Sequence, residues 1–461
     1  MEKQIWSWER TNHLRVLPGE SIFFYNDNGY PTNAENADVI IIGDTNIPFG
    51  RALVAGDFNA DGRTDLVAST DAYNTNGGRV YIFYNDGSIP TTVAEADVII
   101  STEAFGEFFG SSLVGGDFNA DGTIDLAVGA TRHPGGSLIG RVYIFYTDGT
   151  NNFGTATCSG TPAACSATNA DILITGVSSG DYFGLSLGAG DWNADGKTDL
   201  VVGSTAASSG RAYIFYNGSI TTESSSGADV MITGESSGNN FSKSFASGDF
   251  NADGTIDLAV GAYTWGGGGA GRVYIFYNDG NFGTVACTTD CLAATADERI
   301  TGVLGNEYVA FSLATGDFNA DGKTDLVVGA PNDSSTAPGR AYIFYNGAIT
   351  TESVTSADVI INGEETYSFF GNSLAIGDFN SDGRTDLAVG ARYFSSSNRG
   401  KTYIFYSQNG QINTNQNSTG EATGDAFGYA MTAGDWNADG RTDLAVGAYS
   451  YDPGGADGTG R

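Results

Sequence analysis

The amino-acid sequence predicts an all-β protein, a seven-bladed β-propeller with four antiparallel strands per blade. Three observations predict it: an acidic motif occurs seven times, short strand-like segments surround each copy, and the two ends of the chain each supply part of one unit. Repeats of this length with four strands each are typical of propeller blades, which close into a ring.

The motif reads Gly-Asp-aromatic-Asn-(Ala/Ser)-Asp-Gly-x-x-Asp-Leu, and successive copies start 57 to 74 residues apart. The second copy lies among the apolar segments FFGSSLVGG, DLAVGA, GRVYIFY and ADILITG. These segments are rich in β-branched and aromatic residues and are bounded by Gly, Asn, Asp or Ser, as strands are. Glycine accounts for 67 of 461 residues, a share typical of many tight turns. We therefore expect four strands and no helix in each unit.

The two ends of the chain complement each other. The seventh unit stops at GADGTGR, where other units continue into a segment like VYIFY, and residues 19–30 read GESIFFYNDNGY before ADVIIIG. We expect 19–45 and 421–461 to share the closing blade of a single domain, 19–461, with 1–18 unmatched. Such closure leaves no free sheet edge. The alternative, a fragment of a longer array cut at both ends, stays open.

The sixth unit departs from the others, since NGQINTNQNSTGEATG contains no segment like ADVII. We expect its outermost strand to be short or irregular.

The acidic motif has the ligands of a calcium loop. In the first copy Asp57, Asn59, Asp61 and Asp65 offer side-chain oxygens at positions 1, 3, 5 and 9, and the carbonyl of Arg63 is a fifth ligand. Hard oxygen ligands in this number suit Ca²⁺. An EF-hand would need Glu at position 12, where Ala68 stands. Three carboxylates packed together without a cation would repel, so we predict about seven Ca²⁺ ions.

The predicted ligands at positions 1, 3, 5, 7 and 9 of the seven loops are Asp57, Asn59, Asp61, Arg63, Asp65; Asp117, Asn119, Asp121, Thr123, Asp125; Asp191, Asn193, Asp195, Lys197, Asp199; Asp249, Asn251, Asp253, Thr255, Asp257; Asp317, Asn319, Asp321, Lys323, Asp325; Asp378, Asn380, Asp382, Arg384, Asp386; and Asp435, Asn437, Asp439, Arg441, Asp443.

These loops, together with a Phe-Gly pair eight residues before most of them, resemble the FG-GAP repeat family, the seven-bladed propellers of integrin alpha subunits and of many bacterial surface proteins. The pair reads Phe-Ser at 241–242 and Val-Ala at 309–310, and Gly-Ala-Pro is intact only at 329–331. The resemblance covers 19–461. It implies calcium on one face and ligand contact mostly on the other, and seven intact loops favour a stand-alone microbial member. The intact Phe-Gly pairs are 49–50, 109–110, 183–184, 370–371 and 427–428.

Composition limits the partners and the location. The net charge is −33, with 21 Lys and Arg against 54 Asp and Glu, which argues against nucleic acid and anionic membrane surfaces. No apolar run is long enough for membrane insertion. Two close cysteine pairs, 158 with 165 and 287 with 291, predict local disulfides in an oxidising compartment, with free thiols as the alternative. We expect an extracellular or cell-surface location, although 1–18 shows no signal peptide.

The sequence favours a binding protein over an enzyme. Gly-x-Ser-x-Gly strings at 176–180 and 234–238 fall in inter-blade loops with no helix following, unlike a hydrolase nucleophile turn. His13 and His133 are the two histidines. We expect an adhesion or ligand-binding module for a protein or glycan, and no enzyme. The alternatives are a self-assembling subunit of a surface layer or filament and, less favoured, a polysaccharide- or lipid-processing enzyme.

Strand alternation predicts where a ligand would sit. The turns after the DLAVGA-type strands and the inter-blade loops lie opposite the acidic loops, while the cysteine segments share the acidic side. We expect exposed aromatic and basic side chains of these turns to contact the ligand, led by Trp265 and Tyr393. The alternative is that they only cover the blade ends. The candidates are Tyr73, Arg132, His133, Tyr263, Trp265, Arg392, Tyr393 and Tyr451.

Overall fold

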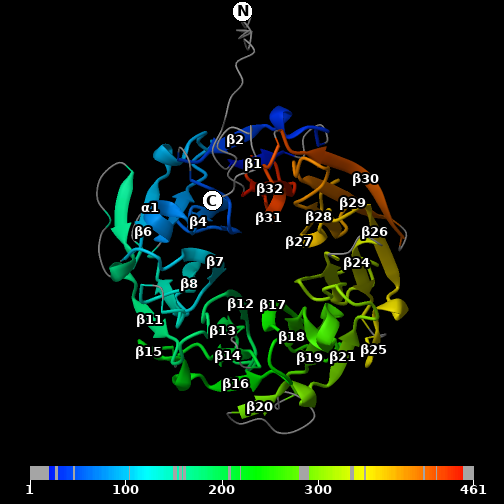
Figure 1. Ribbon diagram of the computed structural model, residues 1–461. Coiled ribbons are helices and arrows are strands. Elements are labelled where there is room, and N and C mark those ends of the chain that lie inside the picture. Colours follow the sequence, from blue (N-terminus) through cyan, green and yellow to red (C-terminus); the bar gives the residue numbers. More distant parts are fainter. Residues whose placement is uncertain are drawn as a thin grey trace, which may run out of the picture.

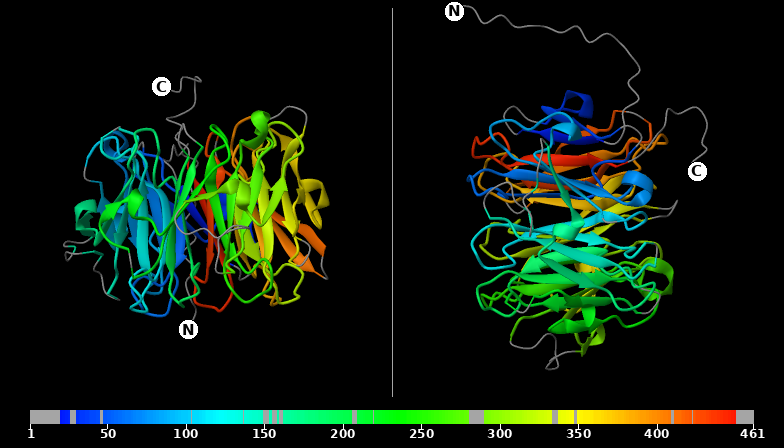
Figure 2. Two further views of the ribbon diagram at one scale, coloured as in Figure 1. Left: turned by 90° about the horizontal axis from the view of Figure 1, so that it is seen from below. Right: turned by 90° about the vertical axis from the view of Figure 1, so that its left-hand side faces the viewer.

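The computed structural model describes residues 20–449 apart from 26–29, 45–46, 103, 136, 149–152, 155–157, 159–161, 206–208, 219, 280–289, 333–336, 347–348, 409–410 and 422. The described chain forms seven sheets arranged as the blades of a closed ring (Figure 1). Figure 2 shows the ring from the side, with the strands running between its two flat faces. The predicted seven-bladed propeller is confirmed. Residues 1–18 lie outside the described part, and the domain bounds stay a prediction.

Each blade has an innermost, a second, a third and an outer strand. The innermost strands are β3 (Leu53–Gly56), β7 (Phe109–Gly116), β12 (Ser186–Gly190), β17 (Phe241–Gly248), β22 (Ser312–Gly316), β27 (Phe370–Gly377) and β31 (Phe427–Gly434). The second strands are β4 (Asp65–Thr70), β8 (Asp125–Ala130), β13 (Asp199–Ser204), β18 (Asp257–Ala262), β23 (Asp325–Ala330), β28 (Asp386–Ala391) and β32 (Asp443–Ala448).

The third strands are β5 (Arg79–Phe83), β9 (Arg141–Phe145), β14 (Arg211–Phe215), β19 (Arg272–Phe276), β24 (Pro338–Phe344), β29 (Lys401–Gln408) and β1 (Glu20–Phe24). The outer strands are β6 (Val98–Ser101), β11 (Ile172–Thr175), β16 (Val230–Thr233), β21 (Glu298–Thr301), β26 (Val359–Thr366), β30 (Gln411–Thr419) and β2 (Val39–Ile42).

The core lies between neighbouring blades. All six residues of every second strand are buried, because both faces of that strand are covered by packed sheets. This explains the apolar run that follows the aspartate in each DLAVGA-type sequence. The aromatic residue at position 2 of each acidic motif is buried and packs with the second strand of the next blade. Phe58 joins Leu126 and Val128, and Trp436 joins Leu66. The aromatic residues at position 2 therefore pack between neighbouring blades.

The ring is closed by strands from both ends of the chain. In the closing sheet, β1 pairs antiparallel with β32 on one side and with β2 on the other. The indole nitrogen of Trp436 donates to the carbonyl of Asp65 in the next blade (3.4 Å). The last blade is therefore completed by N-terminal strands, as the sequence predicts.

Short elements at the rim depart from the prediction of four strands and no helix. Residues just before four outer strands reach back and pair in parallel with the outer strand of the preceding blade; these are β10 (Ala163–Ser166), β15 (Glu223–Ser224), β20 (Asp290–Leu292) and β25 (Glu352–Ser353). They link adjacent blades through backbone hydrogen bonds.

A short helix, α1 (Tyr73–Asn76), lies in one turn, and the other helical segments span three to five residues. These are η1 (Ala34–Asn36), η2 (Val93–Glu95), η3 (Ala167–Asn169), η4 (Ser225–Gly227), η5 (Trp265–Gly269), η6 (Ala293–Thr295) and η7 (Val354–Ser356).

The outer strand of the sixth unit is longer than expected. β30 has nine residues and forms a hairpin with β29, with a bulge between Ile404 and Phe405. The bulge makes the pairing irregular, as one of the two expectations has it, but the strand is not short. A polar strand pairs through its backbone as well as an apolar one does where one side faces solvent.

Antiparallel order assigns the loops to two faces. The acidic loops connect innermost to second strands, and the loops between third and outer strands lie beside them; Thr123 Oγ1, for example, donates to the carbonyl of Thr147 (3.0 Å). The turns after second strands lie with the inter-blade loops, as the bond from Arg132 N–H to the carbonyl of Glu107 (3.1 Å) shows. We call these the acidic-loop face and the opposite face.

Candidate functional site

The seven acidic loops share one hydrogen-bond pattern. In the first loop, Asp57 accepts the backbone N–H of Asp61 (3.0 Å) through Oδ1 and that of Gly62 (2.8 Å) through Oδ2. The Asp61 N–H also reaches Asn59 Oδ1 (3.1 Å). The oxygens of positions 1 and 3 therefore converge on one point of the loop. The same three bonds recur in the other six loops.

The loop backbone is held in an unfavourable conformation. Position 4 is Ala or Ser, yet it adopts a left-handed backbone in every loop, for example φ 57° at Ala60 and 59° at Ser381. Such a residue costs about 1–2 kcal/mol relative to a right-handed one. The left-handed residue recurs in all seven loops despite this energetic cost, and such strained residues are typical of functional loops.

The position-9 aspartates lie beneath the loops and are fully buried. Asp65 Oδ2 accepts the N–H of Phe58 (2.9 Å), and Oδ1 accepts that of Asn85 (2.8 Å), which joins the loop to the end of the third strand. Burial raises the pKa of Asp65 to about 6, and the charges of Asp61 and Asp57 add to the rise against the two backbone donors. The first loop thus places three carboxylates close together. No described basic side chain contributes to the pKa shift of the buried one.

The same rise recurs around the ring. Burial raises the pKa to about 6 at Asp199 and Asp325 and to about 7 at Asp125, Asp257 and Asp386, and in each blade the carboxylates at positions 5 and 1 contribute.

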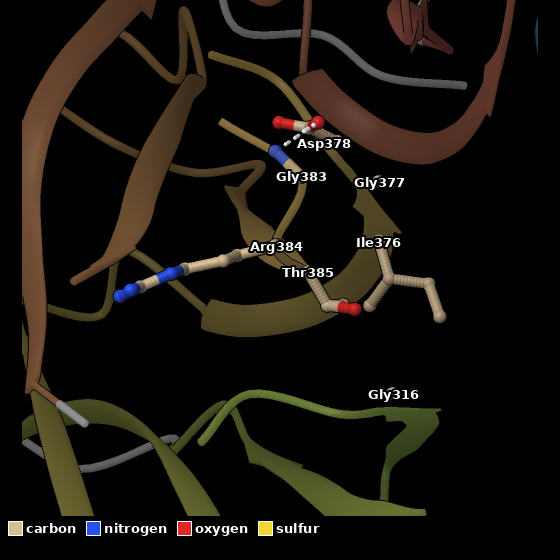
Figure 3. Close-up of a pocket in the computed structure, with 7 residues that line it drawn as sticks. All are labelled: Gly316, Ile376, Gly377, Asp378, Gly383, Arg384 and Thr385. Carbon is tan, nitrogen blue, oxygen red and sulfur yellow. Dashed lines mark hydrogen bonds between the residues drawn. The ribbon is translucent and has the colours of Figure 1, made fainter. Parts of the chain in front are cut away.

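Figure 3 shows the acidic loop of β27 and β28 beside a pocket of about 340 Å³. The Asp378 carboxylate lies at the rim and accepts the N–H of Gly383 (2.8 Å). Gly316, at the end of the neighbouring β22, forms the opposite wall. The hollow between adjacent loops is therefore shared by two blades.

The donor chemistry of these loops fits a hard divalent cation, since it consists of oxygen alone and carries excess negative charge. Positions 1, 3 and 5 lie together, whereas position 9 is turned into the blade. Within the described residues, no three acidic, histidine or cysteine side chains surround a common point. In the first loop the backbone N–H of Arg63, at position 7, donates a hydrogen bond to Asp61 Oδ1 (2.9 Å). The assignment of calcium to these residues stays a proposal.

On the opposite face, several candidate ligand residues are already engaged within the protein. The Arg79 guanidinium lies 3.4 Å from the ring centre of Tyr73, and the Arg132 guanidinium lies 4.2 Å from that of Phe108. Tyr263 packs edge-on against Tyr308. These side chains form the surface of the blade ends.

Two candidates are not exposed as expected. His133 is buried, and its Nδ1 lies 2.6 Å from Glu107 Oε1. Trp265 is half-buried, its indole N–H donates to Glu235 Oε2 (3.0 Å), and Arg272 covers its ring at 3.4 Å. The sequence does not show that buried acids from the inter-blade loops reach these turns.

Tyr393 is exposed by 38%, which agrees with the expectation, and packs edge-on against Phe369. The guanidinium of Arg392 lies 5.0 Å from the ring centre of Phe369 and 5.2 Å from that of Tyr429. Tyr451 lies outside the described residues.

Sequence reasoning missed a group of side chains at the channel entrance of the opposite face. Arg51, Lys243, Phe311 and Tyr429 each follow directly after the Phe-Gly position of their repeat. A comparison of that single position across the seven units would have found them, because equivalent positions in a ring meet around its axis.

The cysteine prediction is confirmed in part. Cys158 and Cys165 form a disulfide next to β10. Cys291 in β20 is disulfide-bonded as well, and its expected partner, Cys287, lies outside the described residues. Among the described helices, none is long and apolar enough to span a bilayer.

Comparisons with known proteins agree with the repeat. The FG-GAP repeat model matches residues 49–83, 109–145, 309–344, 370–405 and 427–461, and the FG-GAP-like repeat model matches 191–260. The WD40 domain of Toxoplasma gondii coronin has a TM-score of 0.48 at 11% identity, covering 88% of this chain and 89% of that one; the sheet order carries the fold assignment without it.

Three relatives illustrate the sequence similarity. Integrin alpha-PS2 of Drosophila melanogaster is 34% identical over 45% of this chain and 15% of its own length. Human integrin alpha-IIb is 32% identical over 45% of this chain and 20% of its own. Human phosphatidylinositol-glycan-specific phospholipase D is 27% identical over 74% of this chain and 43% of its own. The chain therefore spans less than half the length of these relatives. The matched repeats and the integrin similarity show that the chain belongs to the FG-GAP repeat family and is homologous to integrin alpha chains.

Proposed function

We propose that the protein is an extracellular, calcium-binding propeller that acts as an adhesion or ligand-binding module through its opposite face. The observation that carries this proposal is the position of exposed apolar side chains. Six of the eight large apolar side chains exposed among the described residues lie in inter-blade loops or turns of that face. These are Phe105, Val177, Val303, Leu304, Tyr367 and Tyr393. Exposed apolar groups gathered on one face are typical of protein contact surfaces.

Calcium has a structural role in this proposal. The ligands would be positions 1, 3, 5, 7 and 9 of each loop, as expected from the sequence. A bound cation would neutralise the carboxylates around each buried position-9 aspartate, and so remove the repulsion that adds to the rise in pKa caused by burial. It would also fix the left-handed residue at position 4. The opposite face would then be presented by a rigid ring.

The disulfide of Cys158 and Cys165 supports the extracellular location, because such bonds persist in oxidising compartments. The integrin relatives support adhesion. We propose a protein partner first, with a glycan or a second copy of the chain as the alternatives.

An adhesion test compares two surface variants. Fluorescent beads coated with the protein are offered a panel of immobilised secreted proteins and polysaccharides. We expect binding to a panel protein that is lost in Phe105→Ser/Val177→Ser/Tyr367→Ser. The matched control is Leu292→Ser/Ile360→Ser, which removes the two exposed apolar residues of the rim. Equal loss in both variants would contradict the assignment to the opposite face. Bead clumping without panel binding would favour a self-assembling surface subunit.

The similarity to the phospholipase D favours one second candidate, a lipid-processing role. The described histidine, His133, is held by Glu107 inside a blade end and is not offered to a substrate. We therefore propose a non-catalytic role. Release of a phosphatidylinositol-glycan-anchored reporter from vesicles by the pure protein would contradict it.

A further inference from the structure

Three basic side chains meet at the channel entrance of the opposite face, although the protein carries a net charge of −33. They come from three different blades: Arg51 precedes β3, Lys243 lies in β17, and Arg392 follows β28. Together with Phe311 and Tyr429 they form what we call the mouth cluster. Nothing in the repeat motif requires a positive charge at these positions. The equivalents of Arg51 and Lys243 in other blades include Ser111, Leu185 and Asn372, and the equivalents of Arg392 include Thr131, Tyr263 and Tyr449.

Two aromatic rings hold the three cations together. Phe311 is shared by Lys243, whose Nζ lies 5.0 Å from the ring centre, and by the Arg392 guanidinium at 5.8 Å. Tyr429 is shared by Arg392 at 5.2 Å and by Arg51 at 5.3 Å. The three charges are therefore neighbours across the channel, and their mutual repulsion is only partly offset by the ring faces.

Among the described residues, a carboxylate partner is present for only one of the three charges. Arg51 Nε donates to Asp71 Oδ2 (3.0 Å), and Asp71 also accepts the hydroxyl of Tyr449. Within the described part of the chain, no carboxylate contacts Lys243 or the Arg392 guanidinium, and the buried Nε of Arg392 has no hydrogen-bond partner. Buried donors without partners are rare in native proteins and call for an explanation, such as a water, an ion or a ligand group. The cluster keeps two positive charges uncompensated.

The cluster is fixed before any ligand arrives. The backbone N–H of Arg392 donates to Asn372 Oδ1 (3.0 Å), and the Asn372 amide donates to the carbonyls of Gly428 and Tyr429 (3.0 and 3.1 Å). Lys243, Arg51 and Arg392 are each half-buried. Burial and the charges of Arg51 and Arg392 lower the pKa of Lys243 to about 8. A half-buried, preorganised cation pair binds an anion more strongly than exposed side chains do.

We propose that the mouth cluster is a carboxylate-binding site that receives an acidic side chain of a partner protein, with Lys243 and Arg392 as its donors. A protein is favoured over an acidic polysaccharide for two reasons. The same face of the ring carries six exposed large apolar side chains among the described residues, which a protein surface complements. The aromatic faces at the site are already covered by the protein's own cations, so they are not free to stack on sugar rings. This inference rests on the proposed function and names the chemistry of the partner.

The test uses the full chain in millimolar calcium at about 0.15 M salt. The probe is fluorescein-labelled octa-glutamate, and octa-glutamine is the uncharged control. We expect saturable binding of octa-glutamate that weakens about tenfold or more in Lys243→Met/Arg392→Met, as loss of two charge-assisted contacts predicts. The matched control is Arg399→Met, which removes an exposed cation from the turn between β28 and β29 on the same face, and it should change the affinity by less than about twofold. Thermal melting confirms that all variants fold.

Three results would overturn the proposal: no binding of octa-glutamate by the wild-type protein, equal affinity in the wild type and the double variant, or competition by oligogalacturonate or inorganic phosphate that exceeds competition by free octa-glutamate. The proposed function is tested separately, because the triple variant of the apolar residues should lose adhesion to the panel while it still binds octa-glutamate.

Discussion

At the residue level, each member of the Phe-Gly pair has its own structural role at the start of the repeat. Phe109 is buried and packs edge-on against Tyr143 of its own blade (5.3 Å). Gly110 has φ 85°, and a Cβ there would lie 2.9 Å from the Cβ of Ser69 in the preceding blade. The glycine therefore serves both backbone conformation and close approach between blades. Ser242 and Ala310 adopt the same left-handed backbone without being glycine.

Replacing that glycine should destabilise the protein. In Gly110→Ala the new methyl group meets neighbouring atoms in addition to the left-handed strain, so we expect a loss of about 2–4 kcal/mol in the free energy of unfolding. Gly180→Ala is the control, since Gly180 has φ 88° and nothing within 4 Å of an added Cβ; it should lose only about 1 kcal/mol. Denaturant unfolding measures both, and equal losses would contradict the close-approach argument.

The proposed carboxylate site should respond to pH through Lys243. The charged groups that act on it are Arg392 and Arg51, which is paired with Asp71, and the ring centre of Phe311 lies 5.0 Å from its Nζ. The ammonium, whose pKa is lowered to about 8, is charged at pH 6.5 and neutral at pH 9.5, while glutamate stays ionised at both. Affinity for octa-glutamate should therefore fall as pH rises through about 8. Lys243→Met should remove this dependence; a wild-type affinity that stays constant would contradict the role of the lysine.

At the level of elements, the rim strands join blades to one another. β10 pairs in parallel with β6 of the preceding blade, and the disulfide of Cys158 with Cys165 lies at its end. The covalent bond thus restrains the segment that reaches across the blade boundary.

Removing this disulfide should loosen the boundary. For a loop with a sequence separation of 7, the chain-entropy model gives about 2.5 kcal/mol at most. We expect Cys158→Ser/Cys165→Ser to melt at a lower temperature and to lose amide-exchange protection in β10 and β6. Protection in β15 and β11, a boundary with no cysteine, is the internal control. Equal loss at both boundaries would contradict a local role.

The sequence predicts repetitive features well and specific contacts poorly. The second strands are recognised because burial on both faces demands a continuous apolar run. The parallel rim strands are not recognised, since a pair such as Glu223–Ser224 bonds through its backbone and carries no pattern. The burial of His133 likewise depends on Glu107, which lies 26 residues away. The mouth cluster combines residues from five units, and Arg392 follows a second strand whereas the other four follow a Phe-Gly position, so no single repeat position shows the whole cluster.

At the level of the whole molecule, closure depends on the N-terminal strands. β1 lies between β32 and β2, so its removal would expose the edge of β32. Deleting residues 1–18 should leave melting unchanged, because they match no repeat unit. Deleting residues 1–45 should lower the melting temperature and promote aggregation through the free edge. Sedimentation and thermal melting compare the two truncations. Identical behaviour would contradict closure of the ring by the N-terminal strands.

We propose that calcium in the acidic loops stabilises the ring that presents the opposite face. With a dissociation constant of roughly 10⁻⁴ M per site, millimolar Ca²⁺ contributes about 1.4 kcal/mol per site, and seven independent sites contribute on the order of 10 kcal/mol. That is comparable to the stability of a whole domain.

Thermal melting of the full chain in millimolar Ca²⁺ and in excess EDTA tests whether calcium stabilises the ring. We expect the melting temperature to fall by tens of degrees in EDTA and to recover when Ca²⁺ is added back. A melting curve that is the same in both buffers would contradict it.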